Sequence, residues 1–277
     1  MMEAMQASGS THRGLGVTAG LDAGLARELA ARCEQLGYHS LWSNDEPTAR
    51  GLDTLAEFAA ATATLEIGVG VLPLHRYRPA QIAAEVERLG LDPARLWLGI
   101  GSGALARQID ALQRAVAELR MLLPEGTRIV VAAMRPRLCR LGGSIADGVL
   151  LNWMLPDQAA RARGWVREGA AEQRRTPPVV ASYVRVAVGQ GARRRLREHE
   201  SYYRAINEAH RKHFAAMGVP VGSVGIAASQ RSDVLNALAP YHAALDLPVV
   251  RVARRHGPDA AQRRCGRRCA VTTAGGA

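Results

Sequence analysis

Two glycine-rich segments carry the residues whose types and spacing best suit chemistry in this chain. One lies inside the apolar run of residues 67–72, and the other closes the apolar run of residues 96–100. Glycines let a backbone approach a ligand closely, and successive amides before a helix favour an anion or the polar edge of a ring. A tight strand-to-loop turn is the alternative interpretation of both. These candidate cofactor-binding residues are Gly70, Val71, Gly101, Ser102 and Gly103.

Other apolar runs are followed by side chains of use in a binding or acid–base site. Asp45 and Glu46 follow the run at 40–43, where a carboxyl group acts as a general acid if burial raises its pKa, or is solvated in a loop. A tryptophan can form the wall of a planar pocket or pack in the core, and methionine is a flexible filler. The catalytic candidates are therefore Asp45 and Glu46, and the further cofactor-binding candidates are Asn44, Met134, Asn152 and Trp153.

The segment from Leu65 to Gly103 shows which elements position the glycines. It reads as strand, loop, helix, strand and glycine turn, because Pro79 suits a first helical turn and Ile82 and Val86 recur at helical spacing. Two buried strands joined by a helical crossover make a parallel β-α-β unit. The strand ends of such units are where parallel folds keep their chemistry.

The same alternation continues along the chain and predicts an α/β fold, a (β/α)₈ TIM barrel. An open doubly wound sheet is the alternative, but no G-x-G-x-x-G follows the first strand. We expect one barrel domain over residues 1–252, with a mostly helical insertion at about 189–218 after the seventh strand. The expected strands are residues 15–18, 40–43, 67–72, 96–100, 129–132, 148–151, 179–188 and 247–252.

Three motifs together resemble the luciferase-like monooxygenase family, above all its deazaflavin (F-420) branch. They are GVGVLPLHRYRP with GIGSG inside residues 65–103, LWSND at 41–45 and ADGVLLNW at 146–153, and the resemblance extends from Gly14 to Val252. It implies an oxidoreductase that uses F-420, or FMN as second choice, for hydride transfer or oxygen insertion on a small organic substrate. It also implies a non-proline cis peptide at Gly70–Val71, behind the flavin ring.

Some residues depart from the family's pattern. Glu46 stands where many relatives carry a histidine, and Ala104 stands where the deazaflavin enzymes carry a catalytic glutamate. The long excursion over the active site after the fourth strand also looks absent, because a helix is expected from Leu105. These departures keep open a non-catalytic, flavin-binding or cofactor-free relative that acts as a binding module.

The insertion after the seventh strand is expected to cover the pocket or to form a homodimer contact. Its predicted apolar face consists of Tyr202, Tyr203, Ile206 and Phe214. Four histidines of the second half look like surface or interface residues: His199, His210, His213 and His242.

Composition narrows the classes of partner. The net charge of the 277 residues is +11, but aromatic residues are 4%, which leaves few platforms for stacking bases. Lys212 is the single lysine, so almost all of the positive charge comes from arginine. This charge gives no support to nucleic-acid binding. The absence of a transmembrane-length apolar run and of a signal peptide predicts a cytoplasmic protein without a membrane partner. Cys265 and Cys269 have no histidine or second pair beside them, so no metal site is expected.

The tail at residues 253–277 differs from the rest of the chain. It is basic, and Val271 is its one large aliphatic residue, so it has no apolar stripe for the barrel's last helix. We expect a degenerate, disordered end, such as a shifted reading frame in GC-rich DNA produces. Slow hydrogen exchange from Gln262 to Val271 would contradict this expectation.

Overall fold

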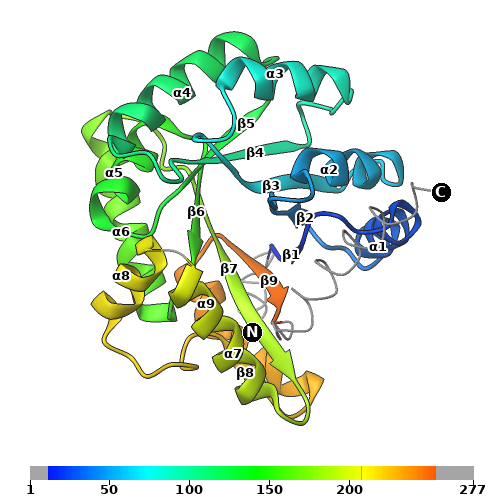
Figure 1. Cartoon of the computed structure of the whole chain (residues 1–277), viewed down its shortest axis with the longest axis vertical. Helices are drawn as coiled ribbons and strands as arrows, with labels where there is room; N and C mark the ends of the chain where they lie inside the picture. The colour runs from blue at the N-terminus through cyan, green and yellow to red at the C-terminus, as the bar shows by residue number, and fades with distance from the viewer. Residues whose placement is uncertain (1–11, 207, 254–277) are drawn as a thin grey trace, which may run out of the picture.

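The computed structural model describes residues 12–206 and 208–253, and its centre is a closed barrel of parallel strands (Figure 1). The strand order is β6-β5-β4-β3-β2-β1-β9-β7, and β6 also pairs with β7, which closes the barrel. This confirms the predicted (β/α)₈ barrel. The barrel strands are β1 (Gly14–Val17), β2 (Ser40–Ser43), β3 (Glu66–Pro73), β4 (Leu96–Gly101), β5 (Arg128–Ala132), β6 (Gly148–Asn152), β7 (Val179–Val188) and β9 (Leu247–Val252).

Helices surround the barrel and cover the outward faces of its strands (Figure 1). Apolar side chains at helical spacing drive this packing; Ile82 and Val86, for example, are buried against the sheet. The helices between strands are α1 (Ala23–Gln35), α2 (Gly51–Ala60), α3 (Pro79–Arg88), α4 (Gln108–Leu122), α5 (Pro136–Ile145), α6 (Pro156–Glu172) and α9 (Arg231–Ala244).

The barrel interior is filled by large side chains, so the barrel is a packed core. Alternate residues of each strand point inward, and Trp42, Trp97 and Leu150 meet Tyr183 and Val249 in one buried cluster. The indole N–H of Trp42 donates to Ser40 Oγ at 2.9 Å, which satisfies a polar group inside this core. The filled interior leaves the carboxyl ends of the strands as the place for a site.

The excursion after β7 is larger than the sequence predicted. It contains α7 (Ala192–Ile206) and α8 (Glu208–Met217), as expected, but then continues into β8 (Ile226–Ala228). Strand β8 pairs in parallel with β7 through Val186↔Ile226 and Val188↔Ala228, outside the closed barrel. The sequence prediction missed β8 and α9, and α9 supplies the helical crossover from this excursion back to β9.

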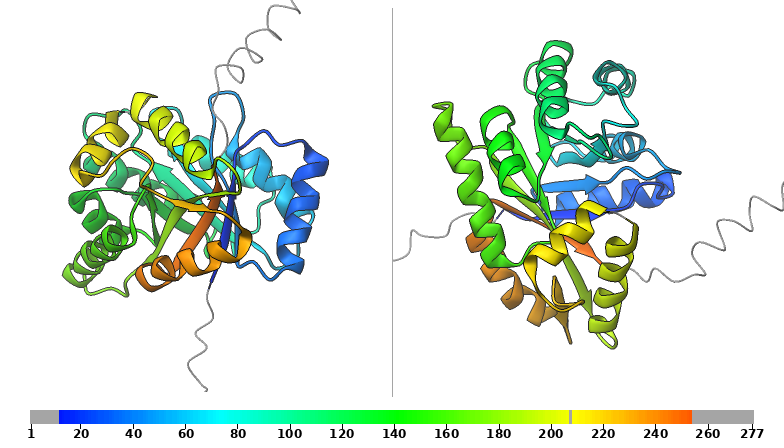
Figure 2. Two further views of the ribbon diagram at one scale, coloured as in Figure 1. Left: turned by 90° about the horizontal axis from the view of Figure 1, so that it is seen from below. Right: turned by 60° about the vertical axis from the view of Figure 1, so that its left-hand side comes forward.

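Figure 2 shows α7 and α8 gathered on one side of the barrel, at the top of its left view. They lie at the carboxyl end of β6, since Phe214 of α8 packs against Trp153, and so they cover the mouth. The predicted apolar face of this cover is half wrong. Tyr203 and Phe214 face inward, but Tyr202 is 42% exposed and Ile206 is 58% exposed.

Two further expectations meet the structure here. The helix after β4 begins at Gln108 and not at Leu105, so a loop of six residues separates it from Gly101. No helix in residues 12–206 and 208–253 is long and apolar enough to cross a membrane. The expectations for Cys265, Cys269 and the disordered tail concern residues 254–277, which lie outside the described part of the chain.

Candidate active site at the barrel mouth

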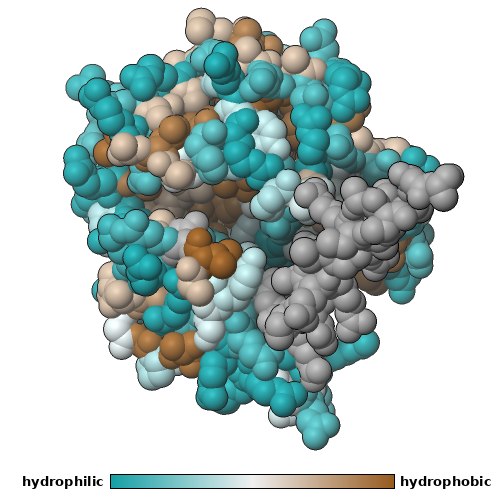
Figure 3. Space-filling model, in the orientation of Figure 1, coloured by the Kyte–Doolittle hydropathy of each residue, from teal (hydrophilic) through white to brown (hydrophobic). Residues whose placement is uncertain are grey.

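The candidate residues come together because all barrel strands are parallel, so their carboxyl ends meet at one end. Figure 3 shows the molecule from the side of the cover helices, with a recess that has an apolar floor between the α3–α5 side and the α8 side. We call this end of the barrel the mouth, and the opposite end the base.

The Gly70–Val71 segment of β3 forms part of the mouth's floor. The peptide bond between these residues is cis, as the family resemblance implied. The Gly70 carbonyl accepts a hydrogen bond from the Tyr183 hydroxyl at 3.2 Å. A Cβ atom at Gly70 would lie 2.4 Å from that hydroxyl and 2.5 Å from Leu150 Cδ2, so glycine is required by packing inside the barrel.

Val71 of β3 and His75 of the loop after β3 hold the glycine turn after β4. A Cβ atom at Gly101 would lie 2.9 Å from Val71 Cγ2, so the missing side chain makes room for Val71. Gly103 has φ +59°, and its Cβ would lie 1.9 Å from His75 Nδ1. The Ala104 amide donates to His75 Nδ1 at 3.3 Å, so one amide of this turn is already used within the chain. The anion-binding role of Ser102 and its neighbours stays a prediction.

Asp45 is held in place by neighbours on every side. Its side chain is fully buried and accepts from the Gly51 amide at 3.0 Å and from the Tyr77 hydroxyl at 3.1 and 3.2 Å. It also forms an ion pair with Arg76 at 3.1 Å. Burial raises the pKa of Asp45 above its usual value, although the Gly51 amide and Arg76 oppose this effect. The carboxyl group therefore lies beside the starts of α2 and α3 and orders this corner.

Asn44 and Glu46 connect the end of β2 to the mouth. Asn44 Nδ2 donates to Glu46 Oε1 at 2.8 Å, and Asn44 Oδ1 accepts from Arg251 Nη2 of β9 at 2.9 Å. The Ala19 amide after β1 also donates to Asn44 Oδ1, at 3.3 Å. Asn44 thus joins the ends of β1, β2 and β9. Through Asn44, it is Glu46 and not Asp45 that is linked to Arg251.

The end of β6 packs directly beneath the cover. Trp153 has φ +55° and is 1% exposed, with ring centroids 5.2 Å from Tyr203 and 5.5 Å from Phe214. Asn152 Nδ2 lies 3.2 Å from His210 Nε2, and Asn152 Oδ1 is buried without a hydrogen-bond partner in the described chain. Met134 packs against the cluster beneath α5 and α6, on the outer side of the sheet. The cofactor contacts predicted for these residues stay predictions.

The histidines of the cover are buried, so their placement on the surface was wrong for two of the four. His199 and His213 are 4% and 5% exposed, and His213 Nε2 lies 2.9 Å from the Trp153 carbonyl oxygen. His210 is half-buried, and burial together with the nearby Arg185 charge lowers its pKa to about 4. His210 is consequently neutral at pH 7.

The sequence prediction missed the charged residues nearest the barrel axis. Arg185 on β7 and Arg251 on β9 are 1% and 6% exposed, and they are register partners in neighbouring strands. A signal was present, because an arginine interrupts each of the apolar runs VVASYVRVAV and LPVVRV. In both runs the arginine takes an inward position of the period-two pattern.

A closed parallel barrel with glycine-rich strand ends, buried polar groups and a helical cover at its carboxyl end defines a (β/α)₈ barrel protein, a class whose sites lie at this end of the barrel. The sequence profile of the luciferase-like monooxygenase family matches residues 5–115 and 111–248. The chain therefore belongs to the luciferase-like monooxygenase family.

Solved structures of low sequence identity share the fold. The chain superposes with a TM-score of 0.71 on an F420-dependent secondary alcohol dehydrogenase in complex with an F420-acetone adduct, at 16% identity over 87% of this chain and 93% of that one. The FMN complex of the oxygenating constituent of 3,6-diketocamphane monooxygenase, from the CAM plasmid of Pseudomonas putida, gives a TM-score of 0.60. Its identity is 15%, over 91% of this chain and 95% of that one.

A curated relative matches a smaller part of the chain. The uncharacterized protein YceB of Bacillus subtilis (strain 168) is 27% identical over 122 residues, which are 39% of this chain. The match spans 37% of YceB, well under two thirds of its length. Its description carries no activity.

Proposed function

We propose that this chain is a flavin- or deazaflavin-dependent oxidoreductase that acts on a small organic substrate at the barrel mouth. F420 is the preferred cofactor and FMN the second choice, with hydride transfer or oxygen insertion as the reaction. Family membership and the fold shared with enzymes of both cofactors support this proposal. The observation that carries it is the floor of the mouth, where Val71 lies over the side-chain-free backbone of Gly101.

The residues at the mouth fit a planar cofactor with a polar edge. Val71 is half-buried and offers an apolar contact for one ring face, and the glycines of β3 and β4 let the strands beneath it pack closely. Asn152 Oδ1 is a buried acceptor without a partner in the described residues, which suits a ring N–H. Such a cofactor, when bound, supplies the hydride or activates the oxygen, and the protein supplies position and electrostatics.

The chain's own groups can orient the ligand and manage protons at the mouth. Burial raises the pKa of Tyr183 to about 12, so its hydroxyl stays protonated and keeps its bond to the Gly70 carbonyl. His210 is neutral at pH 7, because its pKa is lowered to about 4, so its ring can orient a ligand by hydrogen bonding but is a weak proton acceptor there. Asp45, paired with Arg76, and Glu46, held by Asn44, are the proposed catalytic carboxyl groups at this end of the barrel.

A second candidate function is a non-catalytic binding module of the same fold. Trp153 favours it, since the cover encloses the indole that would wall a planar ligand. Glu46 in place of the relatives' histidine points the same way. We keep the enzyme as the first proposal, acting in the cytoplasm on a small molecule; a homodimer through exposed Tyr202 and Ile206 also stays a proposal.

Cofactor titration tests the proposal. We expect F420 or FMN to raise the melting temperature of the purified protein, because a ligand of the folded state stabilises it by mass action. The absorbance spectrum of the cofactor should also shift when it binds. Gly101→Ala should weaken this binding, since the new Cβ pushes on Val71. Gly164→Ala is the matched control, as nothing lies within 4 Å of a Cβ there.

The outcomes separate the two candidate functions. Binding with hydride exchange from reduced F420, or oxygen consumption with reduced FMN, supports the enzyme. Binding without either reaction supports the module. Failure of both cofactors to bind would refute the enzyme and favour the cofactor-free form of the module.

A further inference from the structure

Two arginines lie side by side inside the mouth of the barrel. Arg185 and Arg251 are register partners on β7 and β9, directly above the register pair of Tyr183 and Val249 in the buried interior. Adjacent strands lie about 4.8 Å apart, so the two side chains start from neighbouring positions. Their placement follows from the inward positions of the two strands, and no flexible loop is involved.

Neither arginine forms an ion pair with an acidic residue within residues 12–206 and 208–253. The described salt bridges of the chain include neither residue, and Arg251 has one described side-chain hydrogen bond, to Asn44 Oδ1 at 2.9 Å. In Arg185, Nε, Nη1 and Nη2 are all buried without hydrogen-bond partners. The Tyr203 hydroxyl partly compensates the Arg185 guanidinium for its lost hydration. It does not reach hydrogen-bonding geometry with that guanidinium.

Aromatic rings surround the two guanidinium groups. Arg185 lies 4.6 Å from the Trp153 ring centroid and 5.5 Å from those of Tyr183 and Tyr203, and Arg251 lies 5.0 Å from the Tyr183 centroid. Ring faces attract a cation, but they leave the in-plane N–H donors without acceptors.

Two adjacent buried cations cost folding free energy. Burial, with a smaller contribution from the charge of Arg251, lowers the pKa of Arg185 to about 10, so Arg185 still carries its charge at pH 7. A buried charge without a partner is among the costliest features of a folded chain. A fold that retains such a charge at Arg185, beside the charge of Arg251, has donors at the mouth ready for an anion.

We propose that Arg185 and Arg251 form an oxyanion subsite that binds a carboxylate or phosphate group in the barrel mouth, and that this group belongs to the substrate. The planar guanidinium forks suit both anions, because they donate parallel hydrogen bonds to two oxygens. The inference rests on the proposed function and adds its substrate class, a small organic acid or phosphate ester. Tyr203 of α7 covers Arg185, so the cover shifts when the anion enters.

The first experiment uses inorganic phosphate on the full chain without cofactor. Melting temperature is measured against phosphate concentration, with sodium chloride at equal ionic strength as reference. We expect a saturable rise in the wild type and a loss of about tenfold or more in apparent phosphate affinity in Arg185→Met and in Arg251→Met. Arg161→Met is the matched control, because that side chain is 65% exposed and pairs only with Asp157 among the described residues.

The melting temperatures of the variants without phosphate test whether Arg185 serves binding or only stabilises the fold. Arg185→Met should melt at the same temperature as the wild type or higher, since it removes a buried, unpaired charge. Arg185→Lys and Arg251→Lys keep the charge and should retain part of the phosphate response, even if a methionine variant folds poorly. An unchanged phosphate response in both methionine variants would overturn the proposal, and so would its complete loss in Arg161→Met.

A second experiment identifies the source of the anion. FMN and riboflavin share one ring, but riboflavin lacks the phosphate. If Arg185→Met weakens both flavins equally or neither, while the KM of an acidic substrate rises about tenfold or more, the subsite serves the substrate. If it weakens FMN alone, the subsite holds the cofactor phosphate and the substrate assignment is wrong. If neither F420 nor FMN binds even to the wild type, the proposed enzyme function fails, while the phosphate titration still decides the subsite.

Discussion

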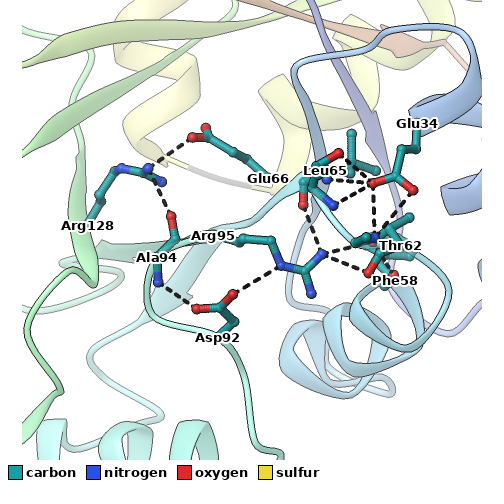
Figure 4. Close-up of polar contacts among 11 residues, drawn as sticks. Glu34, Phe58, Thr62, Leu65, Glu66, Asp92, Ala94, Arg95 and Arg128 are labelled. Atoms are coloured by element: carbon teal, nitrogen blue, oxygen red, sulfur yellow. Dashed lines mark hydrogen bonds and ion pairs between the residues drawn. The ribbon is translucent and has the colours of Figure 1, made fainter.

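The two ends of the barrel treat charge in opposite ways. At the base, charged side chains are matched with partners: Glu34 accepts from the Ala63, Thr64 and Leu65 amides, and Arg95 donates to Thr62 and pairs with Asp92 (Figure 4). At the mouth, Arg185 and Arg251 have no described acidic partner. This difference is what we expect if the base stabilises the barrel, whereas the mouth gives up stability for the binding that we propose there.

The pKa shifts repeat this contrast. Hydrogen bonds from Thr64 and its neighbours hold the pKa of Glu34 below its usual value. His39, Trp97 and Arg128 do the same for Glu66, against the effect of burial. At the mouth, burial lowers the pKa values of His210 and Arg185, which means that the folded state disfavours their charged forms. The base therefore favours the charged forms of Glu34 and Glu66, whereas the mouth disfavours those of His210 and Arg185.

The largest effect is expected at Glu66 of the base. Its carboxylate accepts from Trp97 Nε1 at 2.6 Å and pairs with Arg128 at 2.9 Å and His39 at 3.1 Å. Glu66→Ala should lower the free energy of unfolding by about 3 kcal/mol, because it leaves a buried indole N–H and an arginine unpaired. Urea denaturation measures this. Glu168→Ala, at an exposed pair with Arg140, should cost less than about 1 kcal/mol; equal losses would remove the contrast.

A smaller effect is expected at the floor of the mouth. Gly70→Val should lower the free energy of unfolding by about 2 kcal/mol and weaken both F420 and FMN, since its side chain meets Tyr183 and Leu150. From the sequence alone the fold should survive this change unharmed, but the buried contacts make a stability cost unavoidable. Gly164→Val controls for the loss of glycine. Unchanged titration of both cofactors in a folded Gly70→Val protein would refute the placement of the ring.

The pH dependence of stability should differ between the two ends. The lowered pKa of His210, about 4, means that the unfolded chain binds a proton below about pH 6.5 while the folded chain does not. His210 should therefore contribute a fall in stability of up to about 2 kcal/mol between pH 6.5 and 5, and His210→Gln should reduce the slope. Part of the slope should remain, because burial also lowers the pKa values of His213 and His242. The lowered pKa values of Glu34 and Glu66 add a separate loss only below about pH 4.5. Denaturation at several pH values measures both, and an identical slope in His210→Gln would contradict the assignment.

The smallest change in stability is expected at Asp45. Since burial raises its pKa, the negative charge is not favoured there, and Asp45→Asn should alter the free energy of unfolding by less than about 1 kcal/mol. From the family resemblance we still predict that Asp45→Asn impairs cofactor binding or turnover more than Glu46→Gln does. Turnover and cofactor titration on both variants decide this. A silent Asp45 variant beside an inactive Glu46 variant would reverse the order and favour the carboxyl group tied to Asn44.

Strong local patterns made much of the barrel predictable. Continuous apolar runs marked all eight barrel strands, and Pro79 with Ile82 and Val86 marked α3. Strand β8 was missed because three residues give no periodic signal. Helix α9 was missed because Pro240 interrupts it and its apolar residues form no clear stripe.

The sequence predicted the candidate site only where close backbone packing requires a particular residue type. The glycines of β3 and β4 mark close packing that local sequence reveals. The burial of His199 and His213 depends on how the cover folds back over β6, and a polar helix sequence does not show this. The pairing of Arg185 with Arg251 joins positions far apart in the chain, and barrel closure alone brings them together.

The two ends of the cover leave and rejoin the molecule at the same place. The chain departs from β7 at Val188 and returns as β8 beside it, where the Gly189 amide donates to the Ala228 carbonyl at 2.9 Å. The segment between Gly189 and Gly225 thus leaves and rejoins the barrel at one place. Its helices also pack on the end of β6 at Trp153, but the pairings of β7 with β6 and β9 do not pass through it. Evolution can exchange such a segment for another of different length and still keep the barrel closed. The cover can therefore change while Arg185 and Arg251, the residues proposed to bind the substrate, keep their places on β7 and β9 of the barrel.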